Sequence, residues 1–413
     1  MSGSSRTQTL NALDTTCVIA GGGPAGMMLG FLLARAGIPV TVLEKHKDFL
    51  RDFRGDTVHP STLEIIYELG LLHEFLKLPH SEVGSVRMQI GKDTVTIGRF
   101  DKLPTHCKYV ALMPQWDFLN FLAAHAKQFS GFDLRMSAEA TDLIVDGDRV
   151  AGVRVQTPDG PLEIRAQLTV GCDGRDSTLR SLAGITSENF GAPMDVLWFR
   201  VSRLASDPGD VVGHIEKGSM LVMLNRNDYW QCAFVIPKGG AEAVMREELA
   251  KFRRTIVALA PFLERRLGEI DSWEKVKLLT VAVDRLRRWW RPGLLLIGDA
   301  VHAMSPIGGV GINLAVQDAV AAANILAEPL RHHVVTNETL ATVQRRRKFP
   351  TRLIQRLQIV IQNKLISPAL ADSGEPGAPW FMKMLRLPVL DRLPGRLLAL
   401  AVRPQHVRTP VSK

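Results

Sequence analysis

Residues 16–44 read TCVIAGGGPAGMMLGFLLARAGIPVTVLE, a strand, a glycine-rich turn, an apolar helix and a second strand in succession. This order predicts a βαβ unit with two parallel strands. Gly21, Gly23 and Gly26 have the GxGxxG spacing, in which the glycines allow a tight turn, the approach of a diphosphate and close helix–strand packing. The start of the helix adds amide groups and a positive partial charge, so this segment is predicted to bind a dinucleotide.

The acidic residue Glu44 ends the second strand of this unit. At that position a carboxylate accepts hydrogen bonds from the adenosine ribose and repels a 2′-phosphate, so the site favours FAD or NAD over NADP. The alternative is a glycine-rich turn of some other α/β protein. The strand before the turn, the helix after it and the acid at residue 44 argue together for the dinucleotide.

A second glycine-rich stretch, LLLIGDAVHAMSPIGGVGINLAVQDAV, occupies residues 294–320. An apolar strand runs into Gly298-Asp299, and a polar turn leads to residues 306–311 and to a helix that opens near Ile312 and Asn313. A carboxylate, bare backbone amides and the positive end of a helix thus share one small volume. A flavin matches all three, because it has a ribityl chain and an N1–C2=O edge that becomes negative on reduction.

The chain has 413 residues, a net charge of +9 and a pI of about 9.5. A basic balance can indicate nucleic acid, a membrane surface or anionic ligands. The basic residues are spread along the chain, and the one local run, residues 345–348, is interpreted as a solvated helix face. No zinc-ligand spacing and no RNA-binding aromatic motif occurs, so neither a metal nor nucleic acid is expected.

The four cysteines lie far apart and form no CxxC motif, which predicts reduced thiols in a cytoplasmic protein. The first 15 residues are polar and lack an apolar core, so they are expected to be a disordered or extended tail and not a signal peptide. Residues 17–36 approach the length of a membrane span, but a strand, turn and helix explain them better.

The remaining pattern predicts an α/β fold: a Rossmann-like FAD-binding domain, an antiparallel β-sheet substrate domain and a helical C-terminal segment. Residues 195–240 carry the antiparallel strands, 241–268 a helical stretch and 276–283 a returning strand. We expect residues 1–15 to be a tail and residues 16–190 plus 284–350 to form the FAD-binding domain, of which residues 80–110 contribute to the substrate side. Residues 191–283 are expected to form the substrate domain, and residues 351–413 a C-terminal cap or interface segment.

Three motifs stand in a fixed order: GGGPAG with Glu44, GCDGRDSTLR at 171–180 and GDAVHAMSPIGGVGINLAVQDA at 298–319. Together they resemble the single-component FAD-dependent aromatic hydroxylases, the para-hydroxybenzoate hydroxylase-like group A flavoprotein monooxygenases. Relatives that oxidise quinone precursors, polyketides and antibiotics are similar too. The resemblance covers roughly residues 15–350 and the ending at 404–408. Its motifs are specific for the fold and for FAD, less so for hydroxylation, and poor guides to the substrate.

The resemblance implies FAD as cofactor, NADPH or NADH as a transient co-substrate, and O2 and an aromatic small molecule as substrates. Arg54 would approach the diphosphate, Gln115 would lie near the ribityl chain, and Asp173 of the DG motif would serve both FAD and the entering nicotinamide. The implied cofactor-binding residues are Gly21, Gly23, Ala25, Gly26, Glu44, Lys45, Arg54, Gln115, Asp173, Gly298, Asp299, Gly308, Gly311, Ile312 and Asn313, with Pro306 lining the ring.

Some of these residues have a structural alternative. Arg54 could form a surface ion pair, while Asp173 and Gln115 could cap the helices that follow them. His302, in the GDAxH pattern, is interpreted as a hydrogen-bonding residue of the turn and not as an acid or base.

The mechanism implied is hydroxylation through a flavin C4a-hydroperoxide. No second GxGxxG follows residue 26, so the pyridine nucleotide would bind transiently, donate a hydride and leave. The amides at 311–313 would stabilise the reduced flavin anion. The sheet at 195–240 would exclude water. A flavin-dependent oxidase, reductase or halogenase on the same scaffold, or a flavoprotein that binds a ligand without turnover, are the alternatives; the absence of WxWxIP weakens the halogenase.

Residues of the predicted substrate sheet supply candidates for the pocket. Trp198, Met223 and Gln231 are candidate wall residues, and Tyr229 and Arg200 are candidate catalytic residues, because a phenol reacts faster as its phenolate. Alternation along a strand means that only half of such residues face the cavity. Tyr229 could instead pack in the sheet with its hydroxyl at the edge.

The residues after 351 alternate between apolar and basic stretches. They are interpreted as a cap over the pocket or a dimer contact, in a monomer or homodimer. A basic amphipathic stretch that touches a membrane is one alternative, and simple core packing is the other.

Overall fold

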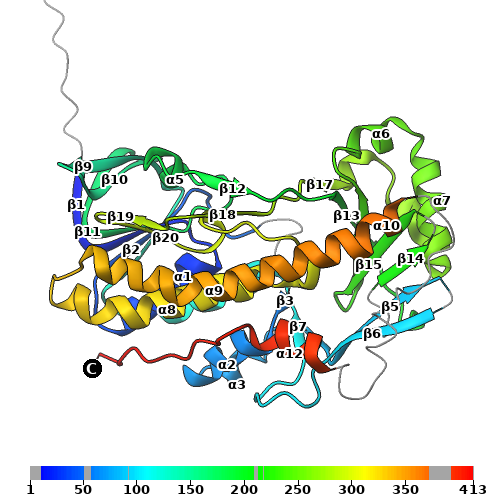
Figure 1. Ribbon diagram of the computed structural model, residues 1–413, viewed down its shortest axis with the longest axis horizontal. Helices are drawn as coiled ribbons and strands as arrows, with labels where there is room; N and C mark the ends of the chain where they lie inside the picture. Colours follow the sequence, from blue (N-terminus) through cyan, green and yellow to red (C-terminus); the bar gives the residue numbers. More distant parts are fainter. Residues whose placement is uncertain are drawn as a thin grey trace, which may run out of the picture.

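The structure is a computed structural model that describes residues 11–50, 57–91, 93–208, 213–216, 218–371 and 392–412. Two large sheets lie at opposite ends of the molecule, and the long helices α8 (Gly311–Arg331) and α9 (Asn337–Ile361) run along one side (Figure 1). Directly after α9 the chain continues through η5 (Gln362–Ile366) into α10 (Ser367–Leu370), which packs on β15 and β16 of the second sheet, so this helical segment connects the two halves.

The first sheet contains the predicted βαβ unit. β1 (Asn11–Ala20), α1 (Pro24–Arg35) and β2 (Val40–Glu44) follow one another, and β1 pairs in parallel with both β2 and β11 (Gly160–Gly171). The parallel strands β8 (Phe132–Met136) and β20 (Leu294–Leu296) extend the sheet on its two sides, and the hairpin β9 (Glu139–Asp146) and β10 (Arg149–Thr157) adds to β11. Residues 11–15, predicted to belong to the N-terminal tail, form the first half of β1.

Small residues allow α1 to pack closely on this sheet. A Cβ at Gly30 would lie 2.6 Å from Cγ2 of Val42, so only glycine fits there. The helix ends at its C-cap Ala36, and Gly37 follows with a φ of 77°, a left-handed conformation that glycine adopts without strain. α8 packs against α1. Residues 307–331 are apolar and long enough to cross a membrane, but 83% of that apolar window is buried inside the protein, as expected for a core helix.

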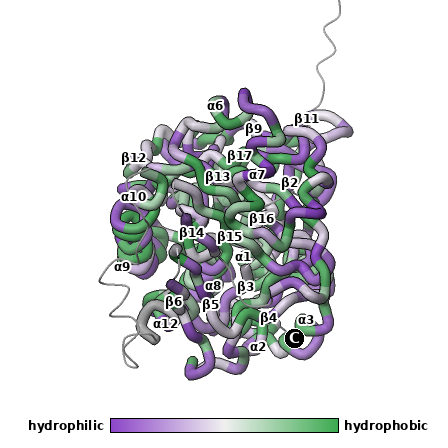
Figure 2. The backbone as a smooth tube through the Cα atoms, turned by 90° about the vertical axis from the view of Figure 1, so that its right-hand side faces the viewer, coloured by the Kyte–Doolittle hydropathy of each residue, from purple (hydrophilic) through white to green (hydrophobic). Residues whose placement is uncertain are grey.

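The second sheet has the strand order β17-β13-β16-β15-β14-β5-β6. Its pairs are antiparallel, apart from the parallel pair β14–β5. Looking onto this end, Figure 2 shows hydrophobic segments of β13 and β16 in the interior and hydrophilic segments toward the rim. The bounds are β5 Ser85–Ile90, β6 Asp93–Arg99, β13 Met194–Ser202, β14 Gly213–Glu216, β15 Ser219–Asn225, β16 Tyr229–Pro237 and β17 Lys277–Leu279.

Each face of the second sheet has a different partner. One face packs on α7 (Leu249–Leu259) and the 3-10 helix η1 (Pro261–Glu269) through residues such as Phe199 and Phe234. The other face packs on Val281 and Ile307. Val281 precedes the second glycine-rich stretch in the chain, and Ile307 lies within it. This second face is therefore the one directed toward the second glycine-rich stretch.

Two predicted elements differ in the structure. The helical stretch at 241–268 is divided into α6 (Ala241–Arg246), α7 and η1, with η1 starting at Pro261. The strand predicted at 276–283 is limited to β17, and the Val281 N–H donates to Asp195 Oδ1 at 2.9 Å. Because this amide bonds a side chain, it does not extend the ladder beyond Leu279.

The end of the chain lies along the first half of the molecule. α12 (Arg392–Leu400) packs on β6, and the residues after it run back past α2 (Pro60–Glu68) and α8 (Figure 1). Arg35 donates to the Thr409 carbonyl at 2.9 Å, and the Val407 N–H donates to Glu68 Oε2 at 2.7 Å. The last described residues thus pack on the core of the FAD-binding half.

Candidate active site

The first glycine-rich turn has the shape that a diphosphate requires. Gly21 has a φ of 106°, and a Cβ there would lie 2.3 Å from the Cys172 carbonyl oxygen. A Cβ at Gly26 would lie 1.9 Å from the Gly21 carbonyl oxygen, so α1 approaches the turn as closely as a backbone can. Among the residues that the structure describes, none has an atom within 4 Å of the Cβ position of Gly23, directly before α1. Open space therefore lies at the positive end of the helix, where a phosphate fits.

Glu44 supports this turn from the end of β2. Its Oε2 accepts the Gly22 N–H at 3.1 Å, and its Oε1 accepts the His46 N–H at 3.0 Å. The side chain is buried, so both bonds act in a medium that screens charge weakly. Glu44 thus fixes the loop in addition to the ribose contact predicted for it. Lys45, the next residue, is exposed.

The second glycine-rich turn touches the first. Gly298 has a φ of 64°, and a Cβ there would lie 3.0 Å from the Cβ of Ala25 at the start of α1. Asp299 is half-buried in the short 3-10 helix η3 (Gly298–Ala300) directly after. The two segments that the sequence analysis singled out therefore meet at one edge of the first sheet.

The start of α8 faces this region without a side-chain cap. No atom of the described part of the chain lies within 4 Å of the Cβ position of Gly311, so with respect to these residues the start of the helix borders open space. The Asn313 Oδ1 is engaged from the other side, by Ser61 Oγ at 2.7 Å and Thr62 Oγ1 at 2.8 Å. These bonds fix the helix start against α2 while its backbone amides stay available for an anionic ligand edge.

A buried carboxylate connects the GD turn to both long helices. Asp318 of α8 accepts the Gly298 N–H at 3.2 Å and His302 Nε2 at 2.6 Å on one oxygen, and Arg347 Nε of α9 at 2.7 Å on the other. Asp318 and Arg347 are completely buried and His302 almost so. The interpretation of residues 345–348 as a solvated helix face is therefore wrong for Arg347, which points into the core because Asp318 requires a cation there.

The ionisation of this cluster follows from its burial and its charges. Burial disfavours the charged forms, but the attraction between His302 and Asp318 outweighs it, so the pKa of His302 is raised and the pKa of Asp318 is lowered. His302 thus holds a proton on Nε2 toward Asp318. This matches its interpretation as a hydrogen-bonding residue of the turn.

Three buried glutamines, two on α9 and Gln362 directly after its last residue, hold the turn that follows. Gln355 Nε2 donates to the Ala303 carbonyl at 3.1 Å, and Gln358 Nε2 donates to the carbonyls of Ser305 and Ile307, both at 2.9 Å. Gln362 Nε2 donates to Ser305 Oγ at 2.9 Å. Sequence reasoning missed these residues, although their spacing of three and four, continuing that of Arg347, was a readable polar stripe.

The DG motif packs beside the GD turn. Asp173 accepts Ser177 Oγ at 2.5 Å and the Leu179 N–H at 3.0 Å, while Ser177 is the actual N-cap of α5 (Thr178–Leu182). Asp173 therefore supports this helix without being its cap. Arg180 donates to the Ala300 carbonyl at 3.1 Å and so connects the two motifs.

Of two other predicted cofactor residues, the structure describes only Gln115. Gln115 is the first residue of α4 (Gln115–Ala126), whose start has no side-chain cap, so the capping alternative is wrong. Arg54 lies outside the described residues.

The substrate candidates divide between the two faces of the second sheet. Trp198, Arg200, Gln231 and Tyr229 lie on the face that packs on Ile307, as the cross-strand pairs Arg200–Gln231 and Trp198–Ala233 show. Pro306 is half-buried beside Ile307. The prediction that Met223 lines the substrate pocket is wrong. Met223 pairs with Cys232, one residue along from Gln231, so its side chain points to the opposite face and packs with α7 and η1.

Arg226 lies in the turn between β15 and β16 and was not among the residues predicted from the sequence. It is buried, and its Nε donates to Gln231 Oε1 at 3.2 Å on the face toward Ile307. Burial lowers the pKa of Arg226 to about 10, so the guanidinium still carries its charge at neutral pH. Nothing in the local sequence RND signals this burial.

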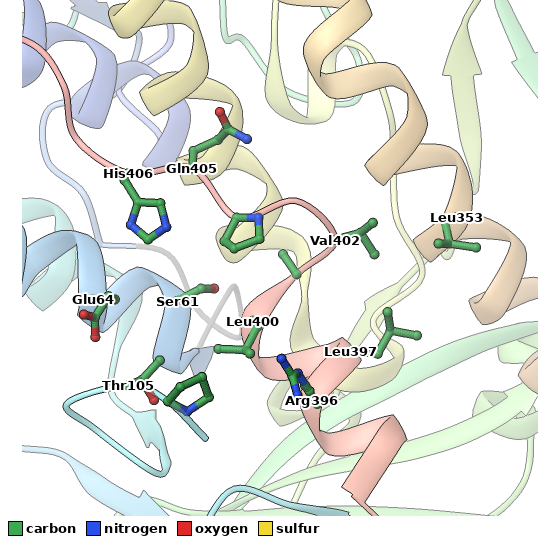
Figure 3. Close-up of a pocket in the computed structure, with 13 residues that line it drawn as sticks. Ser61, Glu64, Thr105, Leu353, Arg396, Leu397, Leu400, Val402, Gln405 and His406 are labelled. Carbon is green, nitrogen blue, oxygen red and sulfur yellow. The ribbon is translucent and has the colours of Figure 1, made fainter. Parts of the chain in front are cut away.

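A separate cavity of about 540 Å³ opens beside α2 and α12 (Figure 3). None of its lining residues comes from either glycine-rich turn, so it is distinct from the flavin site. Its walls are Ser61, Glu64, Pro104, Thr105, Leu353, Arg396, Leu397, Leu400, Ala401, Val402, Pro404, Gln405 and His406.

Fold and site together define a dinucleotide-binding flavoprotein, and residues 14–357 match the model of the FAD binding domain family. The chain belongs to this family, and its resemblance to the FAD-dependent aromatic hydroxylases is confirmed. It is 31% identical over 369 residues to the 6-methylpretetramide 4-monooxygenase of Streptomyces rimosus, covering 89% of this chain and 88% of that protein. A rifampicin monooxygenase of Streptomyces venezuelae is 29% identical, over 73% of this chain and 62% of the relative.

Solved structures agree with this assignment. The OxyS anhydrotetracycline hydroxylase from Streptomyces rimosus superimposes with a TM-score of 0.75 at 25% identity, covering 95% of this chain and 77% of that one. PqsL from Pseudomonas aeruginosa, a probable FAD-dependent monooxygenase, shares the fold with a TM-score of 0.73 at 21% identity, over 87% and 98% of the two chains. The protein is an FAD-dependent monooxygenase of the aromatic hydroxylase type.

Replacing Arg347 by Met should lower the free energy of unfolding by about 3–5 kcal/mol, because Asp318 would keep a buried charge without its cation. Arg345→Met is the matched control. Arg345 belongs to the same basic run but is exposed, and it contacts Glu338 and Thr342 at the surface, so its loss should cost less than about 1 kcal/mol. Urea unfolding of both FAD-loaded variants measures the difference, and equal midpoints would contradict the buried pair.

The stability of the protein should fall as pH rises above 6.5, the ordinary pKa of histidine, through the raised pKa of His302. Because the pKa of His302 is higher in the folded than in the unfolded protein, its proton stabilises the fold fully at pH values below the unfolded pKa. This stabilisation is lost as His302 releases the proton at higher pH. The contribution of Asp318 has the opposite sign and is lost only as pH falls below 3.8 through its lowered pKa. Unfolding of the wild type and His302→Gln from pH 5 to 9 tests this: their difference should shrink with rising pH, and a constant difference would refute it.

Proposed function

We propose that this protein uses NADPH or NADH and O2 to hydroxylate an aromatic, polycyclic small molecule. The observation that carries the proposal is the uncapped start of α8, which borders open space beside the turn at Ile307, opposite the substrate-side face of the second sheet. The relatives that act on 6-methylpretetramide and anhydrotetracycline support a fused-ring substrate.

We assign FAD to the residues that surround the two glycine-rich turns. When bound, FAD accepts a hydride from the nicotinamide and, once reduced, activates O2 for transfer to the substrate. In this assignment Gly23 and the start of α1 hold the diphosphate, Glu44 the adenosine ribose and Asp299 the ribityl hydroxyls. The further members of the set are Gly21, Ala25, Gly26, Lys45, Arg54, Gln115, Asp173, Gly298, Pro306, Gly308, Gly311, Ile312 and Asn313.

The protein itself positions the ligands, places positive charge near the flavin ring and excludes water from the site. The amides of Gly311, Ile312 and Asn313 present the positive end of α8 to the edge of the ring that becomes negative. The substrate-side face of the second sheet excludes water from that edge. On this face Trp198 supplies apolar wall, and Gln231, Arg226 and Arg200 supply polar groups for substrate oxygens.

Two wider assignments complete the proposal. The four cysteines are free, which supports a location in the reducing cytoplasm. The protein acts on small molecules, without nucleic acid, as a monomer or homodimer.

Oxygen transfer is tested by offering the FAD-loaded enzyme a panel of phenols and fused-ring polyketides under 18O2. A true substrate should accelerate NADPH oxidation, and the product should contain one 18O atom for each NADPH consumed. Hydrogen peroxide formed in equal amount with no oxygenated product, for every compound on the panel, would instead establish the oxidase alternative.

Asp299→Ala should raise the dissociation constant of FAD about tenfold to a hundredfold, because it removes hydrogen bonds from a carboxylate to the ribityl chain. Asp146→Ala, in the exposed turn between β9 and β10, is the control and should leave the constant unchanged. Fluorescence titration of the apoprotein measures both. Full flavin retention by Asp299→Ala would refute the ribityl assignment.

A further inference from the structure

Five cations gather on one surface where the strand β18 (Asp284–Leu286) lies against α9. They form what we term the β18–α9 cationic surface, which consists of Arg285, Arg287, Lys348, Arg352 and Arg356. Lys348, Arg352 and Arg356 follow each other at intervals of four along α9 and so share one side of the helix. None of them has a role in the site described above.

Hydrogen bonds place the two contributing segments side by side. Arg285 donates to Gln355 Oε1 at 3.0 Å, and Lys348 Nζ donates to the Arg287 carbonyl at 3.2 Å. The Arg285 guanidinium lies over the ring of Phe190, 4.7 Å from its centroid, and that ring is 40% exposed. The surface is thus a fixed arrangement of guanidinium groups beside an accessible aromatic ring.

Negative charge on this surface is scarce. Glu188 pairs with Arg287, and Asp284 accepts the Ala303 N–H at 2.9 Å. Arg352 and Arg356 are exposed and have no hydrogen-bond or ion-pair partner in the part of the chain that the structure describes.

The cations of this surface repel one another, and this repulsion contributes to lowering the pKa values of Arg285 and Lys348. Burial, and then repulsion by Arg352 and Arg356, lowers the pKa of Arg285. Burial, and then repulsion by Arg352 and Arg285, lowers the pKa of Lys348. A polyanion bound here would relieve that repulsion.

The surface is one side chain away from the flavin turn. Gln355, which accepts from Arg285, donates through Nε2 to the carbonyls of Asp284 at 2.6 Å and Ala303 at 3.1 Å. Ala303 belongs to the turn between Asp299 and the start of α8. An anion held on this surface therefore lies near enough to be the distant end of a molecule whose other end reaches the flavin.

We propose that the β18–α9 cationic surface binds the phosphates of the reduced pyridine nucleotide, and that it selects NADPH over NADH through the 2′-phosphate. The proposal rests on the proposed function, because it requires a hydride donor. A nucleotide fits better than an acidic protein for two reasons: guanidinium groups bind phosphate in a bidentate manner, and the exposed Phe190 ring offers a stacking surface for the adenine. The acidic Glu44 does not conflict with this, since it serves the adenosine of FAD.

The test is the affinity of the FAD-loaded protein for NADP⁺, which binds without being consumed. Calorimetry on the wild type and on Arg352→Gln/Arg356→Gln should show at least a tenfold weaker constant in the variant. NAD⁺ should bind more weakly than NADP⁺ to the wild type and about equally to the variant. Affinity for NADP⁺ should also fall with added salt, and less steeply in the variant.

Arg254→Gln/Lys364→Gln is the control, because it removes the same charge from exposed positions outside the surface. It should leave the constant unchanged. Equal weakening in both double variants, an unchanged constant in Arg352→Gln/Arg356→Gln, or no NADP⁺ binding by the wild type would overturn the proposal, and the surface would then serve another anion.

Anaerobic reduction of the flavin separates this proposal from the proposed function. A wild type that binds NADP⁺ through the surface, yet whose flavin is reduced by neither NADPH nor NADH, would keep the binding site and refute the monooxygenase. If NADPH at low concentration reduced the flavin equally well in the wild type and in Arg352→Gln/Arg356→Gln, the proposed monooxygenase function would stand and the nucleotide site on this surface would be refuted.

Discussion

The charge on Asp318 is the constraint on which the active-site half of the structure depends. A completely buried carboxylate is tolerated only where cations and hydrogen-bond donors surround it. Gly298, His302 and Arg347 meet that requirement, and they come from the GD turn and from α9. Once these partners are in place, α9 must cross α8 at this point. Its next buried positions then fall on the turn at residues 303–307, where the glutamine amides complete the clamp.

Much of this architecture was predictable because its determinants are local. The glycine spacing and Glu44 in residues 16–44, and the strand, GD turn and helix of 294–320, each have their signal within one short segment. Arg347 was not predictable, because a run of four basic residues gives no sign that one of them has a buried partner 29 positions away. The burial of Arg226 could not be predicted for the same reason, because its partner Gln231 meets it only once the two strands have paired.

The second sheet shows a different limit of sequence reasoning. Alternation separates its residues into two sets, but both sets contain large apolar side chains, so the sequence does not say which set faces the flavin. The answer depends on where α7 and η1 return, since they cover the face that carries Phe199 and Met223. The other face retains Arg200, Gln231 and Arg226, and this mixture of polar and apolar groups suits a ligand better than a packed interior does.

The glutamine amides of α9 bond mostly to backbone carbonyls, not to side chains. Because backbone carbonyls are present at every residue, these hydrogen bonds do not depend on which side chains the bound loop carries. The side chains of Met304 and Ile307 take no part in these bonds and instead pack on neighbouring apolar residues. A scaffold of this kind can acquire new specificity by exchanging wall residues one at a time, while the geometry that serves the cofactor is inherited unchanged.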